Sequence, residues 1–228
     1  MEEESCKITV KIIRSKRKTL AIKVNRDETV TVCAPLYLDT PKICGFLKEK
    51  EKWIRKKISE YHATNVLNSA YADFQQVLYL GESYNIVFAN LSHAELNQNQ
   101  KVLIFPRDLD PPAQRKELLR VFRRLAVGYL PQLVSEIGTS MGLCPAEIKV
   151  VKSKGRWGSC DSFRVIKLNL CLIHLPPECI RYVIIHELAH LCHLDHSIDF
   201  WALVARYDSR YKEHRKLLDS YAFLLKMY

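Results

Sequence analysis

The sequence predicts an α+β fold in which a β-rich N-terminal region precedes a mostly helical remainder. Short runs that alternate apolar and polar residues, as half-buried strands do, dominate residues 1–108. Longer runs with apolar residues three or four positions apart, as in amphipathic helices, dominate residues 109–228. We therefore expect a β-rich region with one basic helix over residues 1–108 and a second domain over residues 109–228.

The N-terminal region is expected to begin with strands and then form one helix. Residues 8–13, 20–24 and 29–32 alternate as half-buried strands, and a polar turn between the last two predicts a hairpin. Thr40 and Pro41 then begin a helix that runs to about residue 58. The basic residues on one face of this helix are Lys48, Lys50, Lys52, Arg55, Lys56 and Lys57. Such a face is more often solvated than functional.

Further strands complete this region. Residues 77–88 form a strand pair that turns near Gly81, and residues 102–105 form another strand. The polar residues 91–100 between them are expected to form a loop.

The second part is expected to open with a long helix. Asp110 is a typical N-terminal cap, Pro111 suits the first helical position, and the helical spacing continues to about Met141. Pro131 lies inside this run and predicts a kink or a break, because proline removes a helical hydrogen bond.

Two strands and three helices are expected to follow. The strands cover residues 148–151 and 165–172 and enclose a loop at residues 152–161. Pro176-Pro177 begins the next helix, and helical spacing returns over residues 198–226 in two stretches.

Composition and charge restrict the class of protein. Apolar residues make up 48% of the chain and charged residues 26%, and the 7 glycines exclude a collagen-like chain. The 35 Lys and Arg against 25 Asp and Glu give a net charge of +10. This favours polyanionic partners such as nucleic acid or nucleotides, the alternative being a merely basic soluble surface.

Cysteine usage and hydropathy point to a cytoplasmic protein. The eight cysteines include no C-x-x-C pair, and the acidic start MEEESCK does not resemble a signal peptide. We therefore expect reduced thiols in the cytoplasm. No apolar run approaches the roughly 18 residues of a membrane span, so no membrane insertion is expected.

The sequence His186-Glu187-Leu188-Ala189-His190 lies inside the helix that begins at Pro177. Four residues make slightly more than one turn, so both imidazoles project from one face and can reach one Zn²⁺ at ~2.0–2.1 Å. Glu187 would lie beside the metal, where it can take a proton from bound water. Without a metal, an amphipathic helix with these residues would bury polar groups at a cost in free energy.

A catalytic zinc needs three protein ligands and an open position. His196, six residues after His190, is the expected third ligand. Glu213 is the alternative, because it is the only glutamate after Glu187. His193 stands where metalloproteases with this spacing have a glycine, and it is expected to lie outside the ligand shell. Three imidazoles favour Zn²⁺ as the cofactor.

Several motifs occur in a fixed order along the chain. They are Arg14–Leu20, Ala34-Pro35, Trp53-Ile54, Arg156–Cys160, Leu168–Leu170, Pro176-Pro177, Tyr182–Leu191 and His196–Val204. In this order they resemble the YgjP-like metallopeptidase family, which is related to the SprT-like zincins. The resemblance implies a zincin-like metallohydrolase core behind a β-rich N-terminal region, and a peptide or protein substrate. It also implies that the third metal ligand is His196.

The loop Arg156–Cys160 allows two interpretations. Arg156 is the candidate substrate-binding residue, because a guanidinium can hold a carboxylate or phosphate through two hydrogen bonds. In the structural interpretation, which we favour, Trp157 packs beneath the histidine-bearing helix while Gly158 and Ser159 shape a turn. Cys160 is not expected to act as a nucleophile or a ligand, since the histidines complete a site.

These observations predict a zinc-dependent metallohydrolase, with a metallopeptidase as the favoured reaction and Glu187 as general base. One alternative is a metal-dependent nucleoside triphosphate pyrophosphohydrolase, because basic residues suit phosphates. Another is a nucleic-acid-binding module with accessory zinc, in which residues 14–18 and the basic helix contact phosphates.

The sequence offers candidate residues for two supporting roles, a second donor to the scissile carbonyl and a group that orients a ligand imidazole. Tyr207, Tyr211 and His214 follow the third ligand and are candidates for a second donor to the scissile carbonyl, although packing or surface roles are more common for such residues. Asp195 and Asp199 are candidates for orienting a ligand imidazole through its second nitrogen.

Overall fold

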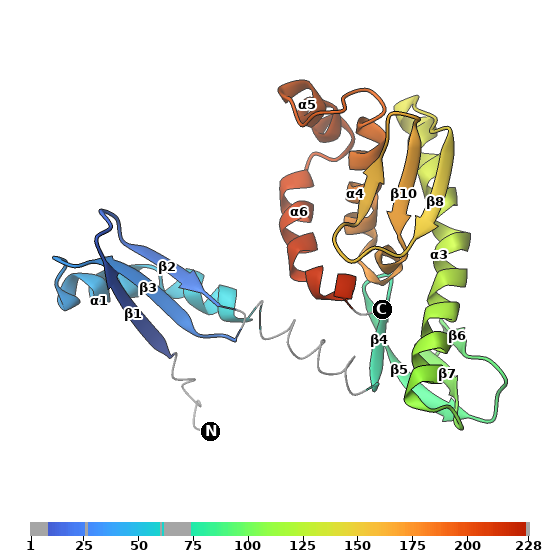
Figure 1. Ribbon diagram of the computed structural model, residues 1–228, viewed down its shortest axis with the longest axis horizontal. Coiled ribbons are helices and arrows are strands. Elements are labelled where there is room, and N and C mark those ends of the chain that lie inside the picture. The colour runs from blue at the N-terminus through green and yellow to red at the C-terminus, as the bar shows by residue number, and fades with distance from the viewer. Residues whose placement is uncertain (1–8, 26, 60, 62–73, 227–228) are drawn as a thin grey trace. The chain divides into compact units, whose positions relative to one another are not determined.

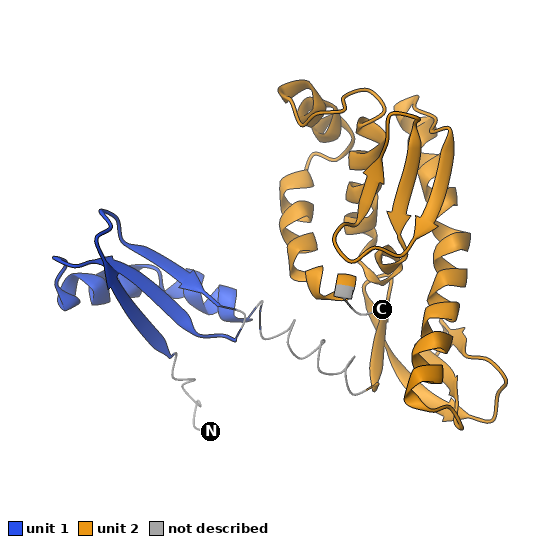
Figure 2. Cartoon of the chain, viewed as in Figure 1, with its two compact units in different colours: residues 1–69 blue, residues 70–228 orange. Residues whose placement is uncertain are grey.

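The computed structural model describes residues 9–25, 27–59, 61 and 74–226. The chain divides into two compact units, residues 1–69 and 70–228 (Figure 2). The sequence predicted the division between residues 108 and 109, because it grouped all the early strands together. In the structure, the strands of residues 76–106 share an apolar core with the long helix that follows them, and they therefore lie in the second unit.

Unit 1 is a small sheet with helical residues packed against it (Figure 1). Its strands are β1 (Val10–Ser15), β2 (Ala21–Val24) and β3 (Val30–Pro35), in the order β1-β3-β2. β3 runs antiparallel to β2, as the predicted hairpin requires, and parallel to β1. Helix α1 (Thr40–Glu49) and the helical residues 51–59 follow.

The core of unit 1 lies between its central strand and the helical residues. Val30, Val32 and Ala34 of β3 alternate toward one face and pack with Ile43 and Ile54. β1 departs from the expected half-buried pattern, because all of its side chains are exposed. It lies at the edge of the sheet, and no side chain of β1 joins the core cluster of the described residues.

Unit 2 contains a sheet with the strand order β4-β5-β7-β6. Its strands are β4 (Gln76–Tyr79), β5 (Glu82–Ala89), β6 (Glu95–Asn97) and β7 (Val102–Pro106). β4 and β5 turn at Leu80-Gly81, where both residues have positive φ, close to the predicted turn. The expectation that residues 91–100 form only a loop is wrong, because β6 pairs with β7 there. This short edge strand is too polar to show an apolar alternation.

Helix α3 (Pro111–Met141) runs beside this sheet and the next one (Figure 1). It begins as predicted, because the Asp110 side chain accepts a hydrogen bond from the Ala113 N–H at 2.8 Å. It continues without a break through Pro131. The buried residues Leu130 and Leu133 on either side of the proline hold the helix against the core despite the missing N–H.

A third sheet and three helices complete unit 2. The strands are β8 (Glu147–Val151), β9 (Gly158–Cys160) and β10 (Val165–Asn169), in the order β8-β10-β9. β9 lies inside the segment predicted to be a loop, and it forms the antiparallel edge of the sheet. The helices are α4 (Pro177–Ala189), α5 (Ile198–Tyr207) and α6 (Tyr211–Ser220), close to their predicted ranges.

The segment before α4 is anchored to the other sheet of the unit. The 3-10 helix Leu170–His174 is buried along its whole length. Its last residue, His174, bonds the Leu78 carbonyl through Nδ1 at 2.6 Å, and the Leu80 N–H donates to the Ile173 carbonyl at 2.8 Å. These contacts fix the point at which α4 begins.

Two further expectations concern membrane-spanning segments and the state of the cysteines. Among the described residues, no helix combines the length and the apolar character that crossing a bilayer requires. Every cysteine in that part of the chain is a free thiol.

Candidate metal centre

Helix α4 presents two histidines from one face. Ile180, Ile184 and Leu188 of this helix are fully buried, so its backbone is held firmly in the core. His186 and His190 lie about one turn apart, and their ring centroids are 4.9 Å apart. Both side chains are only partly buried, so their rings border solvent.

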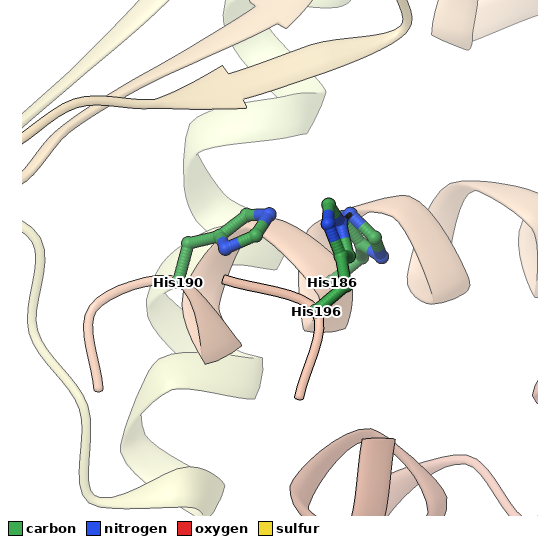
Figure 3. Close-up of side chains that lie close together, drawn as sticks. All are labelled: His186, His190 and His196. Carbon is green, nitrogen blue, oxygen red and sulfur yellow. Dashed lines mark hydrogen bonds between the residues drawn. The ribbon is translucent and has the colours of Figure 1, made fainter. Parts of the chain in front are cut away.

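His196 approaches from the turn between α4 and α5 (Figure 3). The Asp195 side chain accepts a hydrogen bond from the Ser197 N–H at 3.3 Å. The Ser197 hydroxyl in turn begins α5 by accepting from the Phe200 N–H at 3.4 Å. These local contacts shape the turn that directs His196 toward the two histidines of α4.

The three imidazoles converge, as the spacing predicted that they would. One ring nitrogen from each of His186, His190 and His196 lies within 4.8 Å of the others. The Nε2 atoms of His186 and His196 are 3.2 Å apart. Two nitrogens bound at ~2.0–2.1 Å to one tetrahedral zinc ion lie about 3.3 Å apart. The spacing therefore suits a single metal ion of that size.

Burial keeps the two histidines of α4 in the form that a metal needs. The pKa of His186 is lowered to about 3, mainly by burial and further by its two histidine neighbours. Burial also lowers the pKa of His190. Neutral imidazoles offer a lone pair at neutral pH, which metal binding requires. The residues present therefore fit a divalent metal, and three imidazoles suit zinc.

The orientation of His190 is fixed by a backbone carbonyl. Its Nδ1 lies 2.9 Å from the His193 oxygen, so Nδ1 carries the proton and Nε2 keeps its lone pair for the site. The sequence offered Asp195 or Asp199 for such a role, but Asp195 instead bonds Ser197. A carbonyl acceptor depends on the path of the turn, so no residue pattern indicated it.

Glu187 is the buried acidic group beside these histidines. It is 6% exposed, and burial raises its pKa to about 8, while the positive charge of Arg156 opposes this rise. A carboxyl group with such a pKa exchanges its proton near neutral pH, which is the property of a general acid or base.

Gly158 of β9 makes room for the Glu187 carboxyl group. A Cβ atom at this glycine would lie 2.6 Å from Oε1 and 2.7 Å from Cγ of Glu187. Any side chain at this position would therefore displace either the carboxylate or the strand. The sequence interpretation treated Gly158 as a turn residue. A glycine at a strand edge is the signal that could have revealed this contact, because glycine in a strand often marks a close approach of another group.

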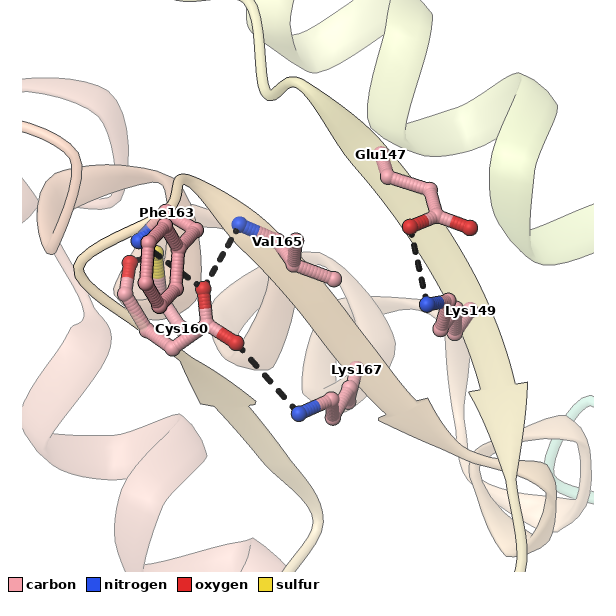
Figure 4. A network of polar contacts seen from close by, with 7 residues as sticks. Glu147, Lys149, Cys160, Phe163, Val165 and Lys167 are labelled. Atoms are coloured by element: carbon pink, nitrogen blue, oxygen red, sulfur yellow. Dashed lines mark hydrogen bonds and ion pairs between the residues drawn. The ribbon is translucent and has the colours of Figure 1, made fainter.

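A polar turn fixes β9 against its neighbour (Figure 4). The Asp161 carboxylate accepts hydrogen bonds from the backbone N–H groups of Phe163 and Val165, each at 3.1 Å, and from Lys167 Nζ at 3.3 Å. These bonds close the hairpin between β9 and β10.

One edge of β9 faces away from the sheet. The Asn169 N–H donates to the Trp157 carbonyl at 2.8 Å, and Ser159 pairs with Lys167, so these positions point toward β10. The alternation of an antiparallel strand turns the N–H and C=O of the intervening residue 158 away from β10. An extended ligand could therefore pair with this edge.

The family of the chain follows from its sequence profile. The profile described as YgjP-like, metallopeptidase domain, matches residues 18–221. The chain belongs to the YgjP-like family. This confirms the resemblance seen in the motifs, and it supports a metallopeptidase, a hydrolase of peptide or protein substrates. No curated protein matches the YgjP-like chain.

Among solved structures, the YgjP-like chain is similar to the metallopeptidase zymogen of Pyrococcus abyssi abylysin. The two sequences are 24% identical, and the match covers 39% of this chain and 90% of the other. The TM-score is 0.36.

Three further candidates of the YgjP-like chain lie outside the histidine cluster. Arg156 is exposed, although its charge reaches Glu187. Burial raises the pKa of Cys160 to about 11, so it stays a thiol. Glu213, the alternative ligand, is exposed on α6 and does not belong to the group of described residues that could hold a metal ion.

The three candidate carbonyl donors make other contacts. His214 pairs with Asp208, the Nδ1–Oδ2 distance being 2.8 Å, and both side chains are mostly buried. Tyr211 stacks on Trp201, and Tyr207 packs against the large core. These contacts favour packing roles over contact with substrate.

Proposed function

We propose that this YgjP-like protein is a zinc-dependent metallopeptidase in which His186, His190 and His196 hold the metal. The observation that carries the proposal is the convergence of one ring nitrogen from each of these histidines within 4.8 Å, next to the buried Glu187. Without a cation, these converging ring nitrogens beside a buried carboxyl group would bring lone pairs together at a cost in free energy.

Glu187 is proposed as the general base. Zinc, when bound, polarises a carbonyl and lowers the pKa of a coordinated water to about 7. The Glu187 carboxylate takes up the proton of the attacking water on an oxygen atom and later passes it to the leaving amine. Its raised pKa, about 8, supports both transfers near neutral pH.

The free edge of β9 is proposed to bind the peptide backbone. The N–H and C=O of Gly158 point away from β10, and a Cβ on this glycine would lie 2.6 Å from Glu187 Oε1. An extended peptide added to this edge would be aligned by main-chain hydrogen bonds, as in other cases of strand addition. The scissile carbonyl of this peptide would then lie near the Glu187 carboxylate.

Arg156 is proposed to contact substrate at the end of this edge. Its side chain is exposed, it lies two residues before β9, and its charge already acts on Glu187. A substrate carboxylate could accept two hydrogen bonds from its guanidinium.

Two substrate panels test this function. Purified, zinc-loaded protein is incubated with casein and a peptide library, and separately with nucleoside triphosphates, beside the Glu187→Gln variant. We expect peptide cleavage by the wild type and none by the variant. Release of pyrophosphate without peptide cleavage would contradict the peptidase and support the nucleotide alternative.

We also propose single-stranded nucleic acid as a partner of unit 1. Tyr37 is 74% exposed, and its hydroxyl donates to the Lys18 carbonyl at 3.4 Å, which places this side chain beside the basic residues 14–18. Arg14, Lys16 and Lys18 are also exposed. An open aromatic ring among cations is the surface on which bases stack.

Oligonucleotide binding measures this second proposal. Affinity should fall as salt rises from ~50 mM, where phosphate contacts are strongest. Tyr37→Ala should weaken binding by about 1–3 kcal/mol, the range for one stacked base. Undetectable binding at ~50 mM salt would contradict the proposal.

A further inference from the structure

The three histidine rings of the metal centre surround one phenylalanine ring. Phe200, on α5, is fully buried. Its ring centroid lies 4.9 Å from that of His186, 4.6 Å from that of His190 and 4.8 Å from that of His196. Against His186 and His196 it makes edge contacts, with interplanar angles of 77° and 72°. One side chain therefore contacts every candidate ligand.

Trp201, the next residue, contacts two of the same rings. Its indole stacks with His196 at a centroid distance of 5.7 Å and an interplanar angle of 28°. It also lies 5.8 Å from the ring of His186, tilted by 59°. Aromatic pairs prefer defined arrangements, so each contact restricts the plane of an imidazole.

Helix α6 holds the indole of Trp201 in turn. Tyr211 stacks with it at 5.2 Å and 19°, and the Arg215 guanidinium lies 5.5 Å from its ring centroid. A cation over an indole face is attracted by the ring quadrupole. Trp201 thus connects α6 with the ligand that lies on the turn.

Hydrogen bonds explain the orientation of only one imidazole within the described part of the chain. The second nitrogen of His190 bonds the His193 carbonyl. The Nδ1 of His186 is buried and has no hydrogen-bond partner among the described residues. The hydrogen bond described for His196 is its Nε2 contact with His186. Metal-binding histidines ordinarily donate the second ring N–H to an acceptor, which fixes the ring.

We propose that Phe200 and Trp201 are positioning residues of the metal centre. Their rings hold the imidazoles of His186 and His196 in the orientation that brings the two Nε2 atoms together. Ring contacts thereby replace the hydrogen bonds that usually orient metal-binding histidines. The inference rests on the proposed function, since it concerns how this chain holds the proposed metal.

Metal affinity and a spectroscopic signature test the role of Trp201. Zn²⁺ affinity is measured by competition with a chromophoric chelator, and the visible absorption spectrum is recorded for the Co²⁺-loaded protein. We expect Trp201→Leu to weaken Zn²⁺ binding by about 10–100-fold, the range for groups that orient ligands, and to change the Co²⁺ spectrum. Trp201→Phe keeps a ring and should restore most of the affinity.

Two more variants separate positioning from general destabilisation. Phe200→Leu should reduce affinity at least as much as Trp201→Leu, because Phe200 contacts all three rings. Tyr129→Leu removes a half-buried aromatic ring from α3 and should leave Zn²⁺ affinity unchanged. Thermal unfolding of each metal-free variant shows whether that variant is folded. If Phe200→Leu does not fold, the two Trp201 variants alone test the positioning role.

The results separate two failures. If the wild type binds Zn²⁺ and Trp201→Leu binds it equally well with an unchanged Co²⁺ spectrum, the positioning role is wrong and the proposed function stands. If the wild type binds neither ion, the proposed function and this inference both fail.

Discussion

Helix α4 and the segment of residues 191–201 build one site by different means. α4 is buried, and its backbone periodicity alone sets His186, Glu187 and His190 on adjacent positions around one turn. His196 is exposed on a turn and depends on contacts with neighbouring side chains. In a helix, the spacing of residues in the sequence therefore sets the positions of the candidate ligands. In a turn, side-chain packing sets these positions, and the sequence spacing does not show that packing.

The largest expected effect separates chemistry from metal binding on α4. Glu187→Gln keeps the size of the side chain but removes its basic oxygen, so kcat should fall by about 10²–10⁴, the usual contribution of a general base. Zinc affinity should stay close to that of the wild type, because the carboxylate lies outside the histidine group. Kinetics and chelator competition measure the two effects separately.

A matched glutamate serves as the control. Glu213→Gln, on the exposed face of α6, should change neither kcat nor zinc affinity. A loss of metal in this variant would mean that Glu213, and not His196, completes the ligand set.

His196, the candidate ligand on the turn, is tested next, for comparison with the residues of α4. His196→Ala removes one of the three converging nitrogens, so zinc affinity should fall by more than the roughly 10–100-fold typical of orienting groups. In His193→Ala the carbonyl that orients His190 remains, and affinity should be nearly unchanged. Isothermal titration calorimetry would measure both. Equal losses in the two variants would contradict the assignment.

Acidification tests the anchor from which α4 begins. Burial lowers the pKa of His174 to about 4, while an unfolded chain has its ordinary value near 6.5. Between these pH values the unfolded state binds a proton that the folded state does not. The contribution of His174 to the free energy of unfolding is therefore fully present above pH 6.5. Up to about 3 kcal/mol of this free energy is lost as the pH falls to about 4.

Urea unfolding of the metal-free protein at several pH values measures this loss. His174→Asn is the matched variant, since its amide N–H can replace Nδ1 as donor to the Leu78 carbonyl but does not titrate. The variant should lose less stability than the wild type over this range. Parallel curves for the two proteins would show that His174 is not responsible.

The smallest expected effect concerns the contact between α4 and β9. Gly158→Ala would place its Cβ 2.6 Å from Glu187 Oε1, and relieving such overpacking costs about 1–3 kcal/mol. Both the unfolding free energy and kcat should decrease. Gly155→Ala is the control, because a Cβ there meets no atom within 4 Å. Equal behaviour of the two variants would contradict the close contact.

The sequence predicted those parts of the protein whose geometry is periodic. Apolar spacing located α3, α4 and α5, and the proline and aspartate at residues 110–111 located the start of α3. The strands β6 and β9 were missed because each has three residues, too few for an alternation to be recognised.

The same reasoning explains what could be predicted of the site. The histidine spacing indicated the converging rings of His186, His190 and His196. The fit of Gly158 against Glu187 depends on long-range folding, and the His193 carbonyl and the rings around Phe200 depend on the path of the chain through the turn after α4. No local pattern encodes such contacts.

Helix α3 lies along two sheets of unit 2, and this has a consequence for truncation. A fragment that starts at residue 109 would keep α3 but lose β4–β7, and so expose Phe122 and its apolar neighbours, which share a core with those strands. The C-terminal half would then be prone to aggregate instead of folding as an autonomous catalytic fragment. Any recombinant version of this half should retain the chain from residue 70 onward.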